Sequence, residues 1–224
     1  MIDPKQNSRR LFIKSTLGAG YLAAMAGSAS VTWSSAAFSQ SAEGYEVLRT
    51  PMPTDDSNSI EVLEFFWFGC PHCYAFEPAI NKWDKSKPDY VSFVREAPPL
   101  NPSWEQHSRA FYAAEAFGIN EGFFDQMFDR IHKDRKPMRN PKNIAQFVER
   151  LELGVSADKF QKAMKSFAVD TAIKRSISKA QAAGINGVPS IIVNGKYRTG
   201  NSIAGSHQGI INAINKLVEI EHNA

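Results

Sequence analysis

Cysteine is scarce in this sequence, because its 224 residues include only two, Cys70 and Cys73. Two cysteines so close together cannot brace a fold of this size, since the loop that they close is too short to constrain the unfolded chain. The shortage also argues against zinc, which takes about four ligands and would have to recruit His72 and a distant histidine. We therefore expect a chemically reactive pair, no metal site, and no cofactor other than the pair itself.

A surplus of positive charge is lacking from most of the chain. The formal net charge is +3, but four of the 26 basic residues and one of the 23 acidic residues lie in residues 1–39. The remainder therefore holds 22 residues of each sign. Binding to nucleic acid depends on neutralising phosphates, so a nucleic-acid partner is not expected.

A long, strongly apolar run is also missing. Residues 8–14 read Ser-Arg-Arg-Leu-Phe-Ile-Lys, and the stretch that follows is rich in Ala, Gly and Ser and too polar for a transmembrane helix. A positive segment, a modest apolar segment and small residues near Ser39 are typical of a secretory signal. Residues 1–39 are predicted to be a cleaved export signal, and the adjacent arginines favour the twin-arginine route.

The two cysteines directly follow the clearest strand signal. In residues 60–68 apolar side chains dominate both alternating faces, which is typical of a strand covered on both sides. Pro71 suits the first turn of a helix, where a missing N–H costs nothing. Cys70 is then expected at a helix N-terminus, where unpaired N–H groups and the helix dipole favour the thiolate over the thiol.

The rest of the chain alternates between strand and helix signals. We expect strands near residues 46–49 and 90–95, short amphipathic helices from residue 101 to 184, a hairpin of residues 190–193 and 196–198, and a final helix around 210–218. This order predicts an α/β class: a thioredoxin-like fold with an inserted α-helical domain. The predicted thioredoxin-like domain comprises residues 40–99 and 185–224, and the helical insertion comprises residues 100–184.

Four stretches of sequence resemble the DsbA family of periplasmic thiol:disulfide interchange proteins. They are residues 62–66 (Val-Leu-Glu-Phe-Phe), 70–74 (Cys-Pro-His-Cys-Tyr), 187–189 (Gly-Val-Pro) and 193–197 (Val-Asn-Gly-Lys-Tyr). The likeness spans both halves of the expected sheet. The Cys-Pro-His-Cys and Val-Pro motifs are independent signals that must meet in space.

The resemblance implies an exported dithiol oxidase of the periplasm that acts as a monomer. Its redox-active disulfide would join Cys70, the nucleophile and exposed member of the pair, to Cys73, the more buried partner. The implied partners are reduced, unfolded exported proteins and a quinone-linked membrane reoxidase of the DsbB type. Two alternatives stay open at this point: a disulfide isomerase or reductase of the same fold, and a peptide-binding, chaperone-like module whose cysteines are vestigial.

Further residues complete the predicted site. The imidazole of His72 can donate to the Cys70 thiolate or lie charged beside it. Glu64 is a carboxylate on an otherwise apolar strand face, so it must be neutral or paired, and a raised pKa would let it exchange protons with Cys73. The family's best-known member carries a lysine near this glutamate, and the nearest basic residue here is Arg95.

Val188 and Pro189 precede a strand, and the resemblance implies a cis bond between them that faces the cysteines. The exposed backbone of Val188 could then pair with an extended substrate segment. The remaining histidines are expected at the surface: His107, His132, His207 and His222.

Overall fold

The structure, a computed structural model, describes residues 43–224. The export signal predicted for residues 1–39 lies outside this range and stays a prediction. Within the described range, no helix is both long and apolar enough to cross a membrane.

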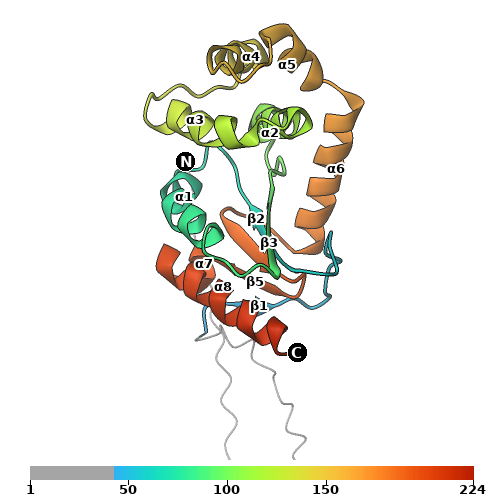
Figure 1. The fold of residues 1–224 in the computed structure, drawn as a ribbon, viewed down its shortest axis with the longest axis vertical. Coiled ribbons are helices and arrows are strands. Elements are labelled where there is room, and N and C mark those ends of the chain that lie inside the picture. The colour runs from blue at the N-terminus through green and yellow to red at the C-terminus, as the bar shows by residue number, and fades with distance from the viewer. Residues whose placement is uncertain (1–42) are drawn as a thin grey trace, which may run out of the picture. The chain divides into compact units, whose positions relative to one another are not determined.

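Five strands of the described range form one mixed sheet (Figure 1). From one edge to the other they are β1 (Glu46–Val47), β5 (Tyr197–Gly200), β4 (Ser190–Val193), β2 (Ile60–Phe65) and β3 (Val91–Glu96). β2 and β3 are parallel, and the other neighbours are antiparallel. Because β2 and β4 are neighbours, the chain segments before and after the helices share one sheet, as predicted.

β2 ends at Phe65, three residues before the predicted end at Phe68. Phe65 lies opposite Glu96 of β3 and Ser190 of β4, and the strand pairing on both sides of β2 ends at these residues. The residue before β4 is a proline without an N–H, and β3 stops at Glu96. The chain therefore leaves the sheet before it reaches the first cysteine.

The strands β1 and β3 also differ from the predicted bounds. β1 is only two residues long, because it pairs with β5 at two positions alone. β3 begins at Val91 rather than at Tyr90, since Tyr90 belongs to a turn and the N–H of Val91 donates to the carbonyl of Pro88 at 3.0 Å. The parallel register consequently pairs Ile60 with Val91.

One short 3₁₀ helix and eight α-helices lie in the described range. They are α1 (Pro71–Asp84), η1 (Pro102–Trp104), α2 (Glu105–Phe117), α3 (Asn120–His132), α4 (Pro141–Arg150), α5 (Ala157–Ala163), α6 (Phe167–Ala182), α7 (Asn201–Ala204) and α8 (His207–His222). Local signals fix several ends. Prolines open α1 and α4, while the Ser166 and Ser206 side chains cap α6 and α8 by accepting backbone N–H bonds.

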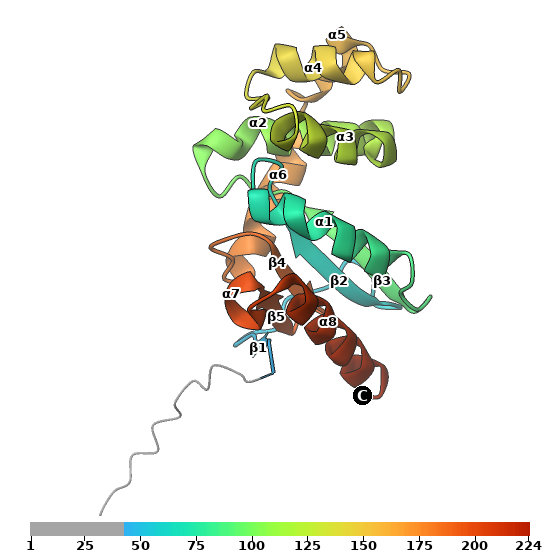
Figure 2. The ribbon, with the colours of Figure 1, turned by 90° about the vertical axis from the view of Figure 1, so that its left-hand side faces the viewer.

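Helices cover both faces of the sheet (Figures 1 and 2). On one face, Phe76 of α1 and Ile214 of α8 pack in a cluster with Val62 of β2. On the other face, Ala180 of α6 packs in a cluster with Leu63 of β2. The C-terminal half of α6 thus covers the sheet, although the predicted insertion ends only after this helix.

A third cluster fills the helical part of the molecule. Phe66 and Phe68, which follow β2, pack there against aromatic rings of α2 and α3, with centroids 5.1 Å apart for Phe66 and Phe111 and 5.0 Å apart for Phe68 and Phe128. The segment that leads to the cysteines is thereby anchored between the sheet and the helices.

Candidate active site

Cys70 occupies the N-cap position of α1. Its backbone is extended (φ −84°, ψ 117°), and its Sγ accepts the N–H of Cys73 at 3.4 Å. A sulfur thus replaces the oxygen that usually caps a helix. On the preceding side, the Cys70 N–H donates to the carbonyl of Trp67 at 2.9 Å. Pro71 is the first helical residue, as predicted.

Both cysteines are free in this structure and both are buried, but not equally. Cys70 is 7% exposed and Cys73 is completely covered. The prediction of an exposed Cys70 is therefore wrong in degree, although Cys70 is the more accessible of the two. Cys70 is covered by a segment distant in sequence, since the Val188 carbonyl lies 3.4 Å from the Cys70 Sγ.

The two thiols have opposite pKa shifts. The hydrogen bond from the Cys73 thiol does most to lower the pKa of Cys70 to about 6, with smaller contributions from the N–H groups of Cys73 and His72 and from the charge of His72. Burial raises the pKa of Cys73 well above its ordinary value, and its hydrogen bond to Cys70 adds to the effect. Cys70 is therefore a thiolate near neutral pH while Cys73 stays a thiol. The side chain of His72 is exposed.

The Val188–Pro189 bond is cis, as expected, and lies beside the cysteines. The Val188 carbonyl contacts the Cys70 Sγ, which brings together the two motifs that the sequence separates by more than a hundred residues. Val188 is half-buried, and Pro189 directly precedes β4.

Glu64 is completely buried, and its partner is Arg95. The two residues are register partners on the parallel strands β2 and β3, and Arg95 Nε lies 2.9 Å from Glu64 Oε2. The Arg95 guanidinium also binds Glu77 Oε2 at 3.1 Å and Asn81 Oδ1 at 2.8 Å on α1. A basic residue therefore does stand beside the glutamate.

Burial raises the pKa of both carboxyl groups, that of Glu77 to about 8, although the charge of Arg95 opposes the shift. One oxygen of each carboxyl, Oε1, is buried without a hydrogen-bond partner. Two carboxyl groups thus share one guanidinium, which favours a proton on one of them near neutral pH. Glu77 was missed from sequence, although it stands four residues after Cys73 and three before Ile80, a spacing that places it on the buried face of the helix.

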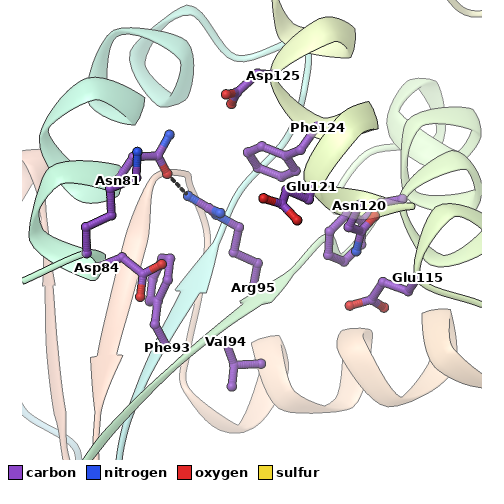
Figure 3. A pocket seen from close by; sticks show the side chains of 12 residues that line it. Asn81, Asp84, Phe93, Val94, Arg95, Glu115, Asn120, Glu121, Phe124 and Asp125 are labelled. Carbon is purple, nitrogen blue, oxygen red and sulfur yellow. Dashed lines mark hydrogen bonds between the residues drawn. The ribbon is translucent and has the colours of Figure 1, made fainter. Parts of the chain in front are cut away.

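Arg95 also lines a cavity of about 610 Å³ between α1, β3, α2 and α3 (Figure 3). Figure 3 shows its side chain reaching from β3 toward Asn81, with the ring of Phe124 nearby. The guanidinium carbon lies 4.3 Å from the Phe124 ring centroid and 4.8 Å from that of Phe93. Aromatic rings therefore support the cation that joins the two carboxyl groups.

The prediction that the other histidines lie at the surface is wrong for all but His222. His107 is 2% exposed and stacks on Trp67, because η1 and α2 pack over the segment before the cysteines. His132 bonds to the carbonyl of Phe68 at 2.8 Å, and His207 is half-buried beside the Phe76 ring. In the range 43–224, no group of three or more His, Cys, Asp or Glu residues is arranged to hold a metal ion.

Residues 61–207 match the family model described as a DSBA-like thioredoxin domain. The chain belongs to the DsbA family. The thiol:disulfide interchange protein DsbA of Azotobacter vinelandii is 38% identical over 180 residues, which are 80% of this chain and 83% of that protein. The DsbA of Pseudomonas aeruginosa is 36% identical over the same length.

Solved DsbA structures agree with this assignment. The crystal structure of Pseudomonas aeruginosa DsbA matches with a TM-score of 0.75 at 35% identity, covering 81% of this chain and 93% of that chain. The DsbA of Xylella fastidiosa matches with a TM-score of 0.75 at 26% identity, covering 81% and 96%. The thioredoxin-like fold with a helical insertion is therefore confirmed, and as a DsbA-family member the chain is a thiol:disulfide oxidoreductase.

Proposed function

We propose that this DsbA-family chain is an exported dithiol oxidase that donates a Cys70–Cys73 disulfide to newly translocated proteins. The observation that carries the proposal is the asymmetry of the pair, with the pKa of Cys70 lowered to about 6 and that of Cys73 raised. A stabilised thiolate on Cys70 lowers the free energy of the reduced pair relative to the disulfide. The Cys70–Cys73 disulfide is therefore a strong oxidant, which transfers readily to client thiols.

The exchange proceeds in two steps. A client thiolate attacks Sγ of Cys70, so a client–Cys70 disulfide forms and the Cys70–Cys73 bond breaks with its electron pair on Cys73. A second client thiolate then attacks the client sulfur of this mixed disulfide and releases Cys70. The client loses two electrons and two protons. The protein gains two electrons and one proton, which Cys73 takes, and the other proton goes to solvent because Cys70 stays a thiolate.

We assign Glu64 the role of proton donor to Cys73. The charge of Glu64 is one of the influences that raise the pKa of Cys73, so the two groups sense each other. Burial raises the pKa of Glu64, so this carboxyl takes up a proton more readily than an exposed one and can pass it to Cys73 when that thiolate is expelled. Arg95 is a positioning residue in this scheme, because it fixes one oxygen of Glu64 and leaves the other unbonded.

The backbone of Val188, held next to Pro189, is proposed to bind the client. Its carbonyl lies 3.4 Å from the Cys70 Sγ. An extended client segment that pairs with this backbone would bring its own cysteine beside the reactive sulfur. Pro71 and His72 complete the site by opening α1 and by adding a backbone N–H and a charge that favour the Cys70 thiolate.

The setting of the reaction is part of the proposal. Residues 1–39 would direct export to the periplasm by the twin-arginine route and be cleaved near Ser39. The clients would be reduced, unfolded exported proteins, and a quinone-linked membrane protein of the DsbB type would reoxidise the pair. The chain would act as a monomer with no cofactor beyond its disulfide. The leader pattern and the DsbA names of the relatives support this setting.

The redox potential of the Cys70–Cys73 couple tests the proposal. We expect equilibration with glutathione to give a couple more oxidising than the glutathione pool. A potential as reducing as that of thioredoxin, about −270 mV, would rule out a dithiol oxidase. Refolding of scrambled ribonuclease then distinguishes an isomerase. A Cys70→Ser variant distinguishes a chaperone-like module, whose protection of clients would survive the change.

A further inference from the structure

A second cavity, of about 450 Å³, lies in the helical part of the molecule. It is bounded by the end of α3, by the loop of residues 133–140, and by α4, which lies over α3 in both ribbon views (Figures 1 and 2). Four of its lining residues are cationic: Arg130, Lys136, Arg139 and Arg150. No carboxylate lines it, and it shares no residue with the cysteine site.

This concentration of positive charge stands out from its surroundings. Residues 43–224 hold 22 basic and 22 acidic residues, so the described part of the chain is neutral as a whole. Arg130 forms an ion pair with Asp134 at 2.7 Å. Lys136, Arg139 and Arg150 form no ion pair with any residue of the described range. The cavity therefore keeps most of its charge unneutralised.

One further donor in the cavity wall has no acceptor. The Nε of Arg130 is buried and without a hydrogen-bond partner, although the same guanidinium donates through Nη1 to Asp134. A buried donor without an acceptor is unfavourable, so the hydrogen bonds of the Arg130 guanidinium in this wall are only partly satisfied.

Hydrogen bonds hold the loop that carries Lys136 and Arg139 in place before any ligand binds. The N–H of Lys136 donates to the carbonyl of Arg130 at 3.1 Å, and the ring of the buried His107 bonds to the carbonyl of Pro137 at 3.1 Å. At the other end, the side chain of Asn140 caps α4 by accepting two backbone N–H bonds. The loop is thus tied to α2, α3 and α4, so a ligand would not have to order it.

We propose that this cavity binds a phosphate-bearing anion, either free phosphate or the phosphate headgroup of an anionic lipid. Guanidinium groups present paired N–H donors that match phosphate oxygens, and a multiply charged anion can engage several cations at once. The amides of Asn143 and Gln146, which also line the cavity, add neutral donors on the same face of α4 as Arg150. This binding is independent of the proposed oxidase function.

The test compares the parent chain with two triple variants. The cavity variant removes the three cations that lack an ion pair: Lys136→Gln, Arg139→Gln and Arg150→Gln. The control variant removes three cations elsewhere: Lys82→Gln, Lys165→Gln and Lys174→Gln. All six side chains are exposed, so both variants should fold, and both lose the same net charge. The full chain is used throughout, so the basic residues before residue 40 are identical in all three proteins.

Each protein is titrated with inorganic phosphate by calorimetry and sedimented with vesicles of phosphatidylglycerol or of phosphatidylcholine. We expect the parent and the control variant to bind, and the cavity variant to bind roughly 10-fold to 100-fold more weakly. Phosphate binding without a preference for phosphatidylglycerol identifies a soluble anion, and a preference for phosphatidylglycerol identifies the headgroup.

Three results would overturn the proposal. The first is a parent chain that binds neither phosphate nor phosphatidylglycerol vesicles. The second is an equal loss of binding in both triple variants, which would mean that net charge alone is responsible. The third is a cavity variant that binds phosphate and vesicles as tightly as the parent chain does.

Discussion

At the scale of single residues, the chemistry depends on the different environments of two neighbouring sulfurs, which shift their pKa values in opposite directions. Cys70 caps α1 and receives hydrogen bonds from the thiol and the N–H of Cys73, whereas Cys73 lies fully inside the protein. The two effects are linked, because the same thiol–thiol hydrogen bond stabilises a thiolate on Cys70 and disfavours one on Cys73. The charge of His72 makes a smaller contribution than this bond.

This ranking predicts different outcomes for two substitutions at Cys73. Cys73→Ser keeps a hydrogen-bond donor near Cys70 and should leave the pKa of Cys70 within about 1 unit of its parent value. Cys73→Ala removes the donor and should raise that pKa further than the serine variant does. The thiolate absorbance of each variant, followed against pH, gives the two values. Equal pKa values in both variants would show that the side-chain bond is not the leading cause.

The raised pKa of Glu77 predicts that the free energy of unfolding depends on pH. Its pKa in the folded protein is about 8, above the ordinary value of 4.5, so the folded state binds the proton more tightly than the unfolded state. The stability contribution of this group therefore falls as pH rises from about 4.5 to about 8, at up to about 1.4 kcal/mol per pH unit. Glu77→Gln should remove this slope, which urea unfolding across the range would reveal as a difference from the parent. Asp158→Asn, an exposed change on α5, is the matched control and should leave the slope intact.

At the scale of elements, the buried carboxylate of Glu96 joins the sheet to two helices. Glu96 is the last residue of β3, it accepts the hydroxyl of Tyr112 from α2, and it pairs with Lys179 of α6 at 3.0 Å. The Tyr112 hydroxyl also accepts the N–H of Ala97 at 3.1 Å. The first long helix of the predicted insertion and its last helix are therefore tied to one point at the end of a strand.

Tyr112→Phe should loosen this junction. The substitution leaves the Ala97 N–H and one oxygen of Glu96 buried without a partner, so we expect a loss of about 1–3 kcal/mol in the free energy of unfolding. Tyr90→Phe is the control, since Tyr90 is exposed and stacks on His222 through its ring alone. Urea unfolding measures both, and faster hydrogen exchange in α2 and α6 of the Tyr112 variant would locate the effect. A Tyr112 variant as stable as its control would show that the Tyr112 hydroxyl does not stabilise the junction between the sheet and these helices.

At the scale of the whole molecule, the lowered pKa of Cys70 couples redox state to folding. In the reduced protein the folded pKa is about 6, below the ordinary thiol value, so this group stabilises the fold above its unfolded pKa and the contribution is lost as pH falls through about 6. In the oxidised protein neither sulfur titrates. The short loop closed by the disulfide adds little stability of its own.

The reduced protein should therefore be more stable than the oxidised protein, and the gap should widen with pH. Guanidinium unfolding of both forms near pH 5 and near pH 8 would measure it, with an expected gain of about 1 to 3 kcal/mol at the higher pH. A Cys70→Ala/Cys73→Ala variant gives the pH dependence of the rest of the molecule. A gap that stays constant between the two pH values would contradict the lowered pKa.

The Glu64–Arg95 ion pair was only half predicted, because both residues were named from sequence but their contact was not assigned. Both strands were predicted, but β3 was placed one residue early. The pairing register between the two strands was not predicted, and a register shifted by one residue would place a neighbour of Arg95 beside Glu64. The turn at Tyr90 fixes the register, and with it the pair.

The sequence by itself determined the reactive pair, the helix that begins at it, the hairpin of β4 and β5, and the family. These features are local, since a helix cap, a turn or a Cys-x-x-C spacing depends on neighbouring residues. Tertiary structure alone decided the burial of Cys70 and His107, the partner of Glu64, the recruitment of Glu77, and the gathering of four cations around one cavity. Each of these depends on segments distant in sequence coming into contact, and burial and electric potential are properties of that assembled neighbourhood.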